Sequence, residues 1–524
     1  MFDALFTTTT EYKKLSHALS GKGACALFGL PASGRAQVYA ALCRQLDKPL
    51  CIVTPGEAEA TRFAADLNTM GIPAAVFPAR DYVLRPIEGT AREYEYRRLA
   101  VLGELVGGRL RAVAVPAEAL TQFTTPKEDF CANTRTLHAG DTLLRDDLLA
   151  ALFGAGYTRR AQVDGPGQFS VRGDIVDIFA PDQKMPVRME FWGDEIDTLH
   201  TFDLTTQRRE DAIDKFYLSP AREVLFGKPA DAAEQLRAFL AKQRGKKKTA
   251  MTDCMAADLD LLDGGAVPVN MDKYLAVRYP HPATVLDYFD DPILVAEEPA
   301  SIREADRATA YRRGEELKSL ILDGVLCAGL DNLYADPSYL WSKTGHYRTI
   351  CAENFARSMP DQPLKDIVNA PAHTLPAWNG EVAGLLEDLK PLCDAGYTVT
   401  LLAGTDRTAA GLARDLRDKG ILVTTDAAAA PAAGLVQVLA GHLSAGCEFP
   451  FAKYALLTGR AFGETSSQKK KRKKAKDALN SLTEITPGDL VVHQNHGIGR
   501  YAGIQRMAVQ GVTKDYLRIE YDKK

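Results

Sequence analysis

The stretch Gly23–Ala36, GACALFGLPASGRA, decides the fold class, because it passes from an apolar run through a glycine-rich turn into helix-forming residues. Ala24–Phe28 predicts a short buried strand, and Gln37–Leu46 predicts the helix after the turn. Gly29 and Gly34 have the spacing of a phosphate-binding loop. The stretch therefore predicts the first strand–turn–helix unit of a parallel sheet.

This loop lacks two of the groups that phosphate chemistry needs. Arg35 stands where a compact Lys ammonium reaches the terminal phosphates, and Ala36 has no hydroxyl to bind magnesium. Loss of one well-placed electrostatic contact costs about 3–4 kcal/mol of transition-state stabilisation, so two changes argue against ATP turnover. Gly29, Gly34, Arg35 and Ala36 are therefore interpreted either as a degenerate nucleotide site or as a sharp turn that packs a helix on a sheet.

A second acidic signal appears later in the chain. The apolar run Ile293–Ala296 ends in Glu297 and Glu298, at the place where a phosphate-loop enzyme holds magnesium and its water. Glutamate pairs at strand ends are also common on ordinary protein surfaces. Together with the altered loop, the two carboxylates indicate a decayed nucleotide site between two α/β lobes.

The composition is that of an ordinary set of folded domains. A chain of 524 residues with 46% hydrophobic and 25% charged residues fits about three to five domains. The net charge of −4 gives no global attraction to nucleic acid. The nine cysteines contain no C-x-x-C pair, which argues against a disulfide framework or a zinc ribbon. Without a signal peptide or a spanning apolar run, we expect a cytoplasmic protein.

Changes in sequence texture divide the chain into six predicted parts. These are an α/β domain at 1–125, an α+β insert at 126–215, a second α/β portion at 216–348, a small α/β domain at 349–462, a basic flexible linker at 463–482 and a β-barrel from 483 to 524. The strand pattern of the barrel is still running at Lys524, so we expect this module to be truncated.

Further elements follow from the same patterns. In the first and fourth parts we predict strands at Leu50–Thr54, Ala74–Phe77, Arg111–Val115, Thr398–Leu402 and Ile421–Thr425, and helices at Glu57–Met70, Arg92–Val106 and Arg407–Lys419. Two helices, Arg145–Phe153 and the weaker Gln207–Asp214, are predicted to frame the short strands of the insert. Gly245–Lys248 is predicted to be an exposed loop.

Four segments carry a resemblance to known proteins, and they occur in the same order. The altered loop, Phe169–Phe179 and Val285–Glu298 resemble the excision-repair protein UvrB. With Pro487–Tyr501 added, the set is similar to the N-terminal half of the bacterial transcription-repair coupling factors. The resemblance implies a multidomain α/β fold with a degenerate phosphate loop in a UvrB-like parallel sheet, an α+β insert, a second small α/β domain and a truncated SH3/Tudor-like barrel.

The resemblance implies a protein that binds partners. In that family the insert binds UvrA and the barrel binds the β subunit of RNA polymerase. A double-stranded DNA translocase that uses ATP and magnesium comes after the barrel in the chain. The whole protein displaces polymerase stalled at lesions and recruits UvrA. We expect this chain to be a monomer without catalytic residues, without a metal or cofactor of its own and without membrane contact, and DNA contact to depend mainly on the motor.

Two other functions stay open at this point. One is an active UvrB-like excision-repair ATPase or helicase. The other is a DNA binder that uses the basic run Lys469–Lys476 to hold phosphates. No aromatic residues are interleaved with this run to stack bases, so the sequence favours a solvated linker there.

The resemblance also supplies the candidate UvrA contacts. UvrB-like inserts meet UvrA through the motifs Y-x-R and F-R-V-R, which match Tyr157–Arg159 and Phe169–Arg172 here. Arg159, Phe169 and Arg172 are therefore the expected UvrA-binding residues. Ser170 replaces the first arginine of the second motif, so one family contact is missing. Solvated surface arginines on a twisted sheet are the alternative interpretation.

The last module supplies the candidate polymerase contacts. The expected polymerase-facing residues are Arg500, Tyr501, Ile504, Leu517 and Ile519. Strand alternation turns one set of side chains inward, so half or more of the apolar ones can instead form the barrel core. His493 and His496 are three residues apart, but no cysteine or third ligand is nearby, and we expect no metal there.

Overall fold

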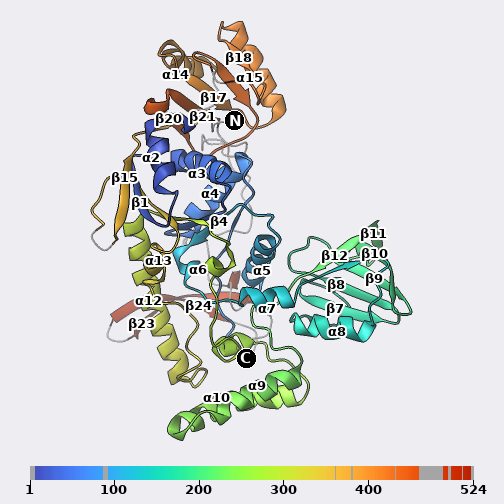
Figure 1. Ribbon diagram of the computed structural model, residues 1–524. Coiled ribbons are helices and arrows are strands. Elements are labelled where there is room, and N and C mark those ends of the chain that lie inside the picture. The colour runs from blue at the N-terminus through green and yellow to red at the C-terminus, as the bar shows by residue number, and fades with distance from the viewer. Residues whose placement is uncertain are drawn as a thin grey trace. The chain divides into compact units, whose positions relative to one another are not determined.

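The computed structural model describes residues 6–86, 92–359, 362–378, 382–430, 432–459, 488–493, 497–509 and 512–520. The chain forms two compact units, Met1–Ala461 and Phe462–Lys524 (Figure 1).

A seven-stranded parallel sheet forms the centre of the first unit. Its strands are β1 (Gly23–Phe28), β2 (Leu50–Thr54), β3 (Ala74–Val76), β4 (Ala112–Pro116), β13 (Ile293–Glu297), β14 (Arg348–Glu353) and β15 (Leu364–Asn369). They lie in the order β15-β1-β14-β13-β2-β4-β3, and all the pairings are parallel. The predicted parallel sheet is thus confirmed.

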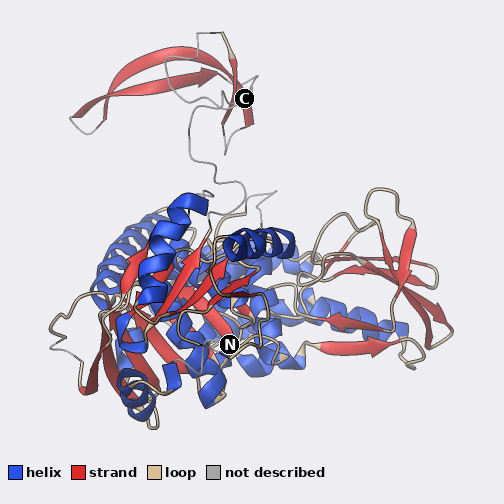
Figure 2. Cartoon of the chain, turned by 90° about the horizontal axis from the view of Figure 1, so that it is seen from above, coloured by secondary structure: helices blue, strands red, loops and turns tan. Residues whose placement is uncertain are grey.

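Helices cover both faces of this sheet (Figure 2). One layer is α2 (Thr10–Ala18), α3 (Ala32–Leu46) and α4 (Glu57–Thr69), and the other contains α5 (Glu93–Val106), α6 (Ala117–Leu120), α12 (Pro299–Leu322) and α13 (Tyr339–Lys343). Leu50 and Ile52 of β2 pack in the first layer, whereas Cys51 and Val53 pack in the second. A strand that alternates between two apolar layers has no polar face, which explains its uninterrupted apolar sequence.

The insert is a separate six-stranded sheet with its own core. Its strands are β6 (Thr158–Arg159), β7 (Gln168–Arg172), β8 (Ile175–Phe179), β9 (Val187–Trp192), β10 (Glu195–Phe202) and β11 (Arg209–Ala212), in the order β11-β10-β9-β8-β7-β6. Helix α8 (Arg145–Gly154) packs on one face of the sheet through Leu148 and Leu152. A ribbon of β5 (Arg135–His138) and β12 (Lys215–Leu218) joins the two ends of the insert.

A helical portion flanks the insert in the sequence. It contains α7 (Lys127–Ala132) before the insert and α9 (Pro229–Ala241), α10 (Gly245–Asp263), η1 (Met271–Tyr274), α11 (Leu275–Arg278) and η2 (Val285–Tyr288) after it. The predicted exposed loop at Gly245–Lys248 is wrong, because these residues form the first turn of α10. The predicted helix Gln207–Asp214 is also wrong, because β11 pairs there with β10 and satisfies its backbone groups in a sheet.

A second α/β sheet completes the first unit. Its strands are β16 (His373–Leu375), β17 (Thr398–Leu402), β18 (Val423–Thr424), β19 (Val436–Leu439), β20 (Gly446–Phe449) and β21 (Tyr454–Thr458), in the order β16-β20-β21-β17-β19-β18. Helices α14 (Val382–Asp394) and α15 (Asp406–Asp418) share a core cluster with it. The expected start of this domain at residue 349 is too early, because β14 and β15 belong to the central sheet.

The described part of the second unit is a three-stranded antiparallel sheet. It consists of β22 (Leu490–His493), β23 (Gly497–Val509) and β24 (Val512–Glu520). The SH3/Tudor-like barrel stays a prediction. The basic run Lys469–Lys476 and His496 lie outside the described residues.

Candidate functional site

The turn after β1 is shorter than the sequence predicts. Helix α3 begins at Ala32, so that only three residues, 29–31, separate it from β1. Gly29 has φ +88°, and a Cβ there would lie 3.0 Å from the Asn369 Oδ1 atom. This glycine is therefore required by a left-handed backbone and by the close approach of the chain after β15.

Gly34 lies inside α3 and not in the turn. A Cβ at this position would lie 2.9 Å from the Cys447 sulfur and 3.4 Å from the Phe449 ring, both on β20. The neighbouring Ser33 hydroxyl donates to the Gly446 carbonyl at 3.4 Å. The small domain therefore packs directly on the first turn of α3, and Gly34 permits that close packing.

Arg35 is bound by the two carboxylates that the sequence singled out. Its Nε atom lies 2.9 Å from Glu297 Oε2, and its Nη2 atom donates to Glu298 Oε1 at 2.9 Å. Arg35 is 4% exposed and Glu297 2%. Tyr39 donates from its hydroxyl to Glu297 Oε1 at 2.5 Å. The structure thus brings Arg35, Glu297 and Glu298 together, although they are more than 260 residues apart in sequence.

Burial and neighbouring charges shift the pKa values of this cluster. Burial alone lowers the pKa of Arg35, but Glu297 and its neighbours outweigh burial and raise it above its ordinary value. Burial raises the pKa of Tyr39 well above its ordinary value, so that its hydroxyl keeps the proton that it donates. The arginine charge is neutralised within the protein. Ala36 is fully buried in the same core.

The predicted residues of the insert separate into core and surface. Phe169 is fully buried and stacks edge to face on Phe153, with ring centroids 5.3 Å apart. The expectation that Phe169 contacts a partner is therefore wrong for its side chain, because the alternation of β7 turns it toward α8. Arg159 is exposed and lies opposite Phe169 in the β6–β7 register.

Arg172 is half exposed and held in place. Its Nη2 atom donates to Asp177 Oδ2 at 2.6 Å, and 46% of its side chain is exposed. Asp177 is 1% exposed and also accepts from Arg188, at 2.7 and 3.0 Å. The buried carboxylate orients both arginines and leaves further N–H groups of Arg172 available to an acceptor.

Strand β9 adds residues that the sequence reading missed. Val187, Met189 and Phe191 are buried, so that Arg188, Glu190 and Trp192 point to the other face of the sheet. Trp192 is 82% exposed, and the N–H of the preceding residue donates to the Asp174 carbonyl in the turn after Arg172. The alternating apolar and polar pattern of 187–192 was the signal that could have revealed this face.

All five candidate polymerase-facing residues lie on two neighbouring strands, β23 and β24. In the β23–β24 register Arg500 pairs with Glu520, Tyr501 with Ile519 and Ile504 with Leu517. Arg500 is exposed, whereas Tyr501 is 5% exposed and therefore offers little surface to a partner. The register brings all five candidates onto one hairpin, and their contact with polymerase stays a prediction.

The described ranges hold neither a metal cluster nor a membrane-spanning helix. They contain no group of three or more His, Cys, Asp or Glu residues that could hold a metal ion. None of their helices combines the length and apolarity needed to cross a membrane.

Two families match parts of the chain. The family described as UvrB interaction domain matches residues 136–224, which begin in β5 and end just after β12. The family described as CarD-like/TRCF RID domain matches residues 485–524, which include β22, β23 and β24. Both matches fall on parts of the structure that stand as separate sheets.

Proteins named transcription-repair-coupling factor match almost all of the chain. The protein of Bacillus subtilis (strain 168) is 27% identical over 510 residues, covering 94% of this chain and 43% of the relative. Those of Staphylococcus haemolyticus (strain JCSC1435) and Staphylococcus aureus (strain MRSA252) are 26% and 24% identical with the same coverage. The chain spans less than half the length of these curated relatives. The matches confirm that the chain resembles the N-terminal part of the transcription-repair coupling factors.

Proposed function

We propose that this chain is the partner-binding part of a protein that couples transcription to nucleotide-excision repair. Its insert binds UvrA, and its second unit contributes to binding the RNA polymerase β subunit. The whole protein recognises stalled polymerase, displaces it with an ATP-driven DNA translocase and recruits UvrA. The names of the two matching families and of the relatives support these assignments.

The closed Arg35 cluster is the observation that carries the proposal. A phosphate-binding site needs free backbone N–H groups and an available cation at the start of the helix. Here Arg35 is already paired with Glu297 and Glu298, and Gly34 is covered by β20. This position stabilises the contact between two domains and does not hydrolyse ATP. It argues against the alternative of an active UvrB-like ATPase.

The insert supplies a surface suited to a protein partner. Arg172 is oriented by Asp177, and Trp192 stands beside the same turn with 82% of its surface exposed. Arginine and tryptophan are the residues most enriched at the energetic centres of protein interfaces, because each buries much area and makes directed contacts. Trp192 extends the proposed UvrA surface beyond the two arginines named from the sequence.

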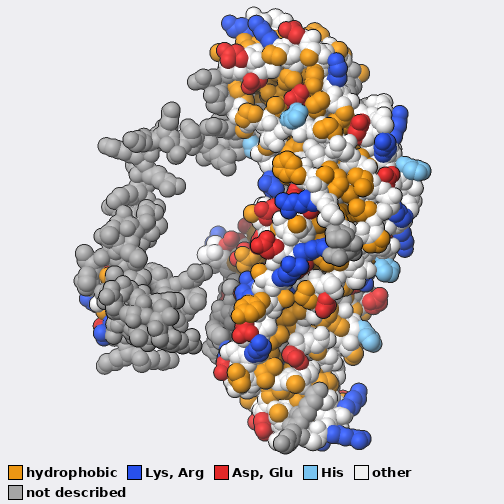
Figure 3. Space-filling model, turned by 90° about the vertical axis from the view of Figure 1, so that its left-hand side faces the viewer, with side chains coloured by type: hydrophobic (Ala, Val, Ile, Leu, Met, Phe, Trp, Pro, Cys, Tyr) orange, Lys and Arg blue, Asp and Glu red, His pale blue; other side chains and the backbone are white. Residues whose placement is uncertain are grey.

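The described residues show no broad basic patch on the face of the molecule that Figure 3 gives. Lys and Arg side chains are interspersed there with Asp and Glu, which favours protein partners over a nucleic-acid backbone on that face. DNA binding through the run Lys469–Lys476 stays a separate prediction. Gel shifts that disappear when residues 466–476 are deleted would support it.

The proposal is tested by binding and turnover measurements on the purified chain. UvrA is expected to bind, and Arg159→Ala/Arg172→Ala to weaken the complex at least about tenfold, whereas Arg208→Ala, an exposed arginine elsewhere on the insert, leaves it unchanged. Unchanged affinity of the double variant would remove these sites. ATP turnover that disappears in Arg35→Ala would instead favour the ATPase alternative.

A further inference from the structure

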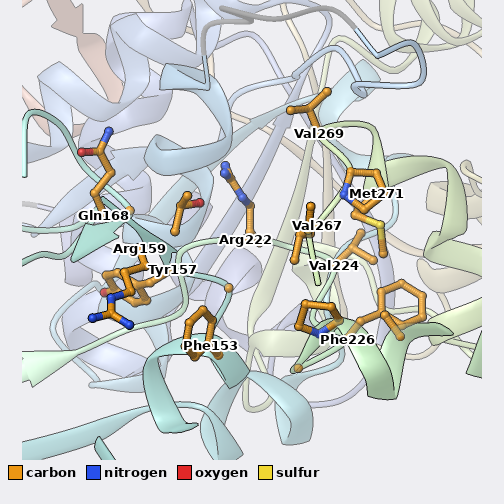
Figure 4. A pocket seen from close by; sticks show the side chains of 18 of the residues that line it. Phe153, Tyr157, Arg159, Gln168, Arg222, Val224, Phe226, Val267, Val269 and Met271 are labelled. Atoms are coloured by element: carbon orange, nitrogen blue, oxygen red, sulfur yellow. The ribbon is translucent and has the colours of Figure 1, made fainter. Parts of the chain in front are cut away.

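A cavity of about 680 Å³ lies between the insert and the helical portion of the first unit (Figure 4). One side is formed by the insert, from the end of α8 through β6 to Gln168. The other side is the extended segment 265–271 together with Val224 and Phe226. Arg222 stands between these two sides. None of the candidate nucleotide or polymerase residues lines it.

The cavity is positively charged on the insert side. Arg159 and Arg160 are exposed at its rim, and neither side chain forms an ion pair or hydrogen bond with the described part of the chain. Arg222 is 24% exposed, and its Nη1 atom has no hydrogen-bond acceptor, with Glu95 Oε2 3.7 Å away. Gly156 makes room for this arginine, because a Cβ there would lie 2.7 Å from the Arg222 Cγ atom.

The ion pairs around and beneath the cavity do not neutralise this charge. They join Arg80, Arg92, Arg98 and Arg222 to Glu95, Glu223 and Asp272. Four guanidinium groups therefore meet three carboxylates, which leaves this network one positive charge in excess, and Arg92 and Arg222 of the network line the cavity themselves. Asp272 is the carboxylate that lines the cavity, and its Oδ2 atom already lies 2.7 Å from Arg80. The cavity thus lacks a partner for its cations.

The opposite side is apolar and aliphatic. Val267 is 55% exposed and Val269 41%, and Met271 lies just behind them. Val224 and Phe226 extend this side inward and are less than 10% exposed. Arg92 fixes the valine segment by donating from Nη2 to the Val269 carbonyl at 2.6 Å. Two exposed valines on a fixed segment present apolar area that an apolar side chain would cover.

Charge and shape together select one class of occupant. Guanidinium groups bind carboxylates through paired N–H donors. A nucleic-acid strand would also satisfy the cations, but its bases need exposed aromatic faces, and the exposed apolar residues here are valines. We propose that this cavity binds an extended acidic segment of a partner protein. In the complex, carboxylates of the segment meet Arg159, Arg160 and Arg222, and its aliphatic side chains cover Val267 and Val269. The inference rests on the proposed function only through Arg159, which belongs to both surfaces.

The direct test is fluorescence anisotropy with labelled eight-residue peptides on the whole chain. The probe alternates Glu or Asp with Val or Leu. One matched peptide replaces every carboxylate by its amide, and another replaces every aliphatic residue by Ser. The acidic aliphatic peptide is expected to bind about tenfold more tightly than either matched peptide, because each loses one of the two sets of contacts. Equal binding of the three peptides, or no binding, overturns the inference, as does tighter binding of an eight-nucleotide oligothymidylate.

Variants locate the binding. Arg159→Gln/Arg160→Gln and, separately, Val267→Ser are expected to weaken the acidic aliphatic peptide about tenfold each. Arg208→Gln and Leu422→Ser are the matched controls at exposed positions outside the cavity, and both are expected to leave peptide binding unchanged. Unchanged peptide binding in Arg159→Gln/Arg160→Gln and in Val267→Ser overturns the inference. Arg172 does not line the cavity. Loss of UvrA binding in Arg172→Ala with intact peptide binding therefore separates the two proposals. If the chain fails to bind UvrA but binds the peptide, the proposed function fails and the peptide site stands.

Discussion

Gly34 of α3 and Cys447 of β20 lie so close that a Cβ on residue 34 would come within 2.9 Å of the Cys447 sulfur. The two residues belong to different domains of the first unit. Their contact explains a glycine that the sequence alone assigns to a phosphate loop. It also makes the packing of the small domain on α3 a quantity that can be measured.

Gly34→Ala is expected to destabilise the first unit by about 1–3 kcal/mol, because the buried Cys447 side chain and the Phe449 ring must shift to admit a methyl group. Urea unfolding followed by circular dichroism measures this change. Gly314→Ala in α12 is the matched control, since a Cβ there meets no atom within 4 Å and alanine favours a helix. Equal or greater stability of Gly34→Ala would contradict the packing described here.

Arg35→Met leaves the carboxylate of Glu297 buried without its cation. Removing one partner of a buried ion pair costs about 3–5 kcal/mol, whereas replacing both by apolar residues costs much less. The double variant Arg35→Met/Glu297→Leu is therefore expected to be more stable than Arg35→Met alone. A double-mutant cycle in chemical denaturation measures the coupling. Additive losses would show that the two side chains act independently.

Restoring the missing groups of the phosphate loop is expected not to restore nucleotide binding. Arg35→Lys/Ala36→Thr supplies the ammonium and the hydroxyl, but α3 still begins at Ala32 and β20 still covers Gly34. Binding of a fluorescent ATP analogue with magnesium measures the outcome, with the unaltered chain as reference. Saturable binding by the double variant would mean that side-chain identity, and not backbone geometry, closed the site.

Glu95 is expected to make stability depend on pH in the acid range. Burial raises the pKa of Glu95, but Arg80, Arg222 and Arg92 outweigh burial and lower it from 4.5 to about 2. The resulting stabilisation is fully present above the unfolded value and is lost as the pH falls toward 2. It amounts to about 3 kcal/mol at most. The stability difference between the unaltered chain and Glu95→Gln should therefore be large at pH 6 and shrink below pH 4.5, and a constant difference would contradict this.

Trp192→Ala is expected to weaken UvrA binding at least about tenfold, because an exposed tryptophan beside an oriented arginine is a typical energetic centre of an interface. The stability of the chain should change by less than about 0.5 kcal/mol, since the side chain is 82% exposed. Titration calorimetry with UvrA and thermal unfolding give the two readouts. Leu422→Ala, at another exposed apolar position, is the control.

Elements with strong local periodicity could be predicted from the sequence. The helix predicted at Glu57–Met70 is α4, and the one predicted at Arg407–Lys419 is α15, each within one residue at both ends. Their apolar stripes and flanking glycines act locally. The start of α3 was placed five residues too late, because glycine, proline and serine favour a loop and only packing against β20 makes Gly34 helical.

Long-range relationships were beyond the sequence. Strands β14 and β15 look like the start of a new domain, since nothing in a buried strand tells which parallel sheet it joins. The residues of the Arg35 cluster could be named individually, but their pairing depends on β1, β14 and β13 lying side by side. Phe169 was assigned to a surface by its motif, whereas the face that it occupies depends on α8.

The two ends of the insert meet in a ribbon, where Arg135 pairs with Leu218. A segment whose entry and exit are neighbours, and which has its own apolar core, can be exchanged without rerouting the host sheet. The insert of such a protein is a structural unit that can be replaced as a whole. Replacement of residues 135–218 would change the surface that the insert presents while the host lobe keeps its architecture.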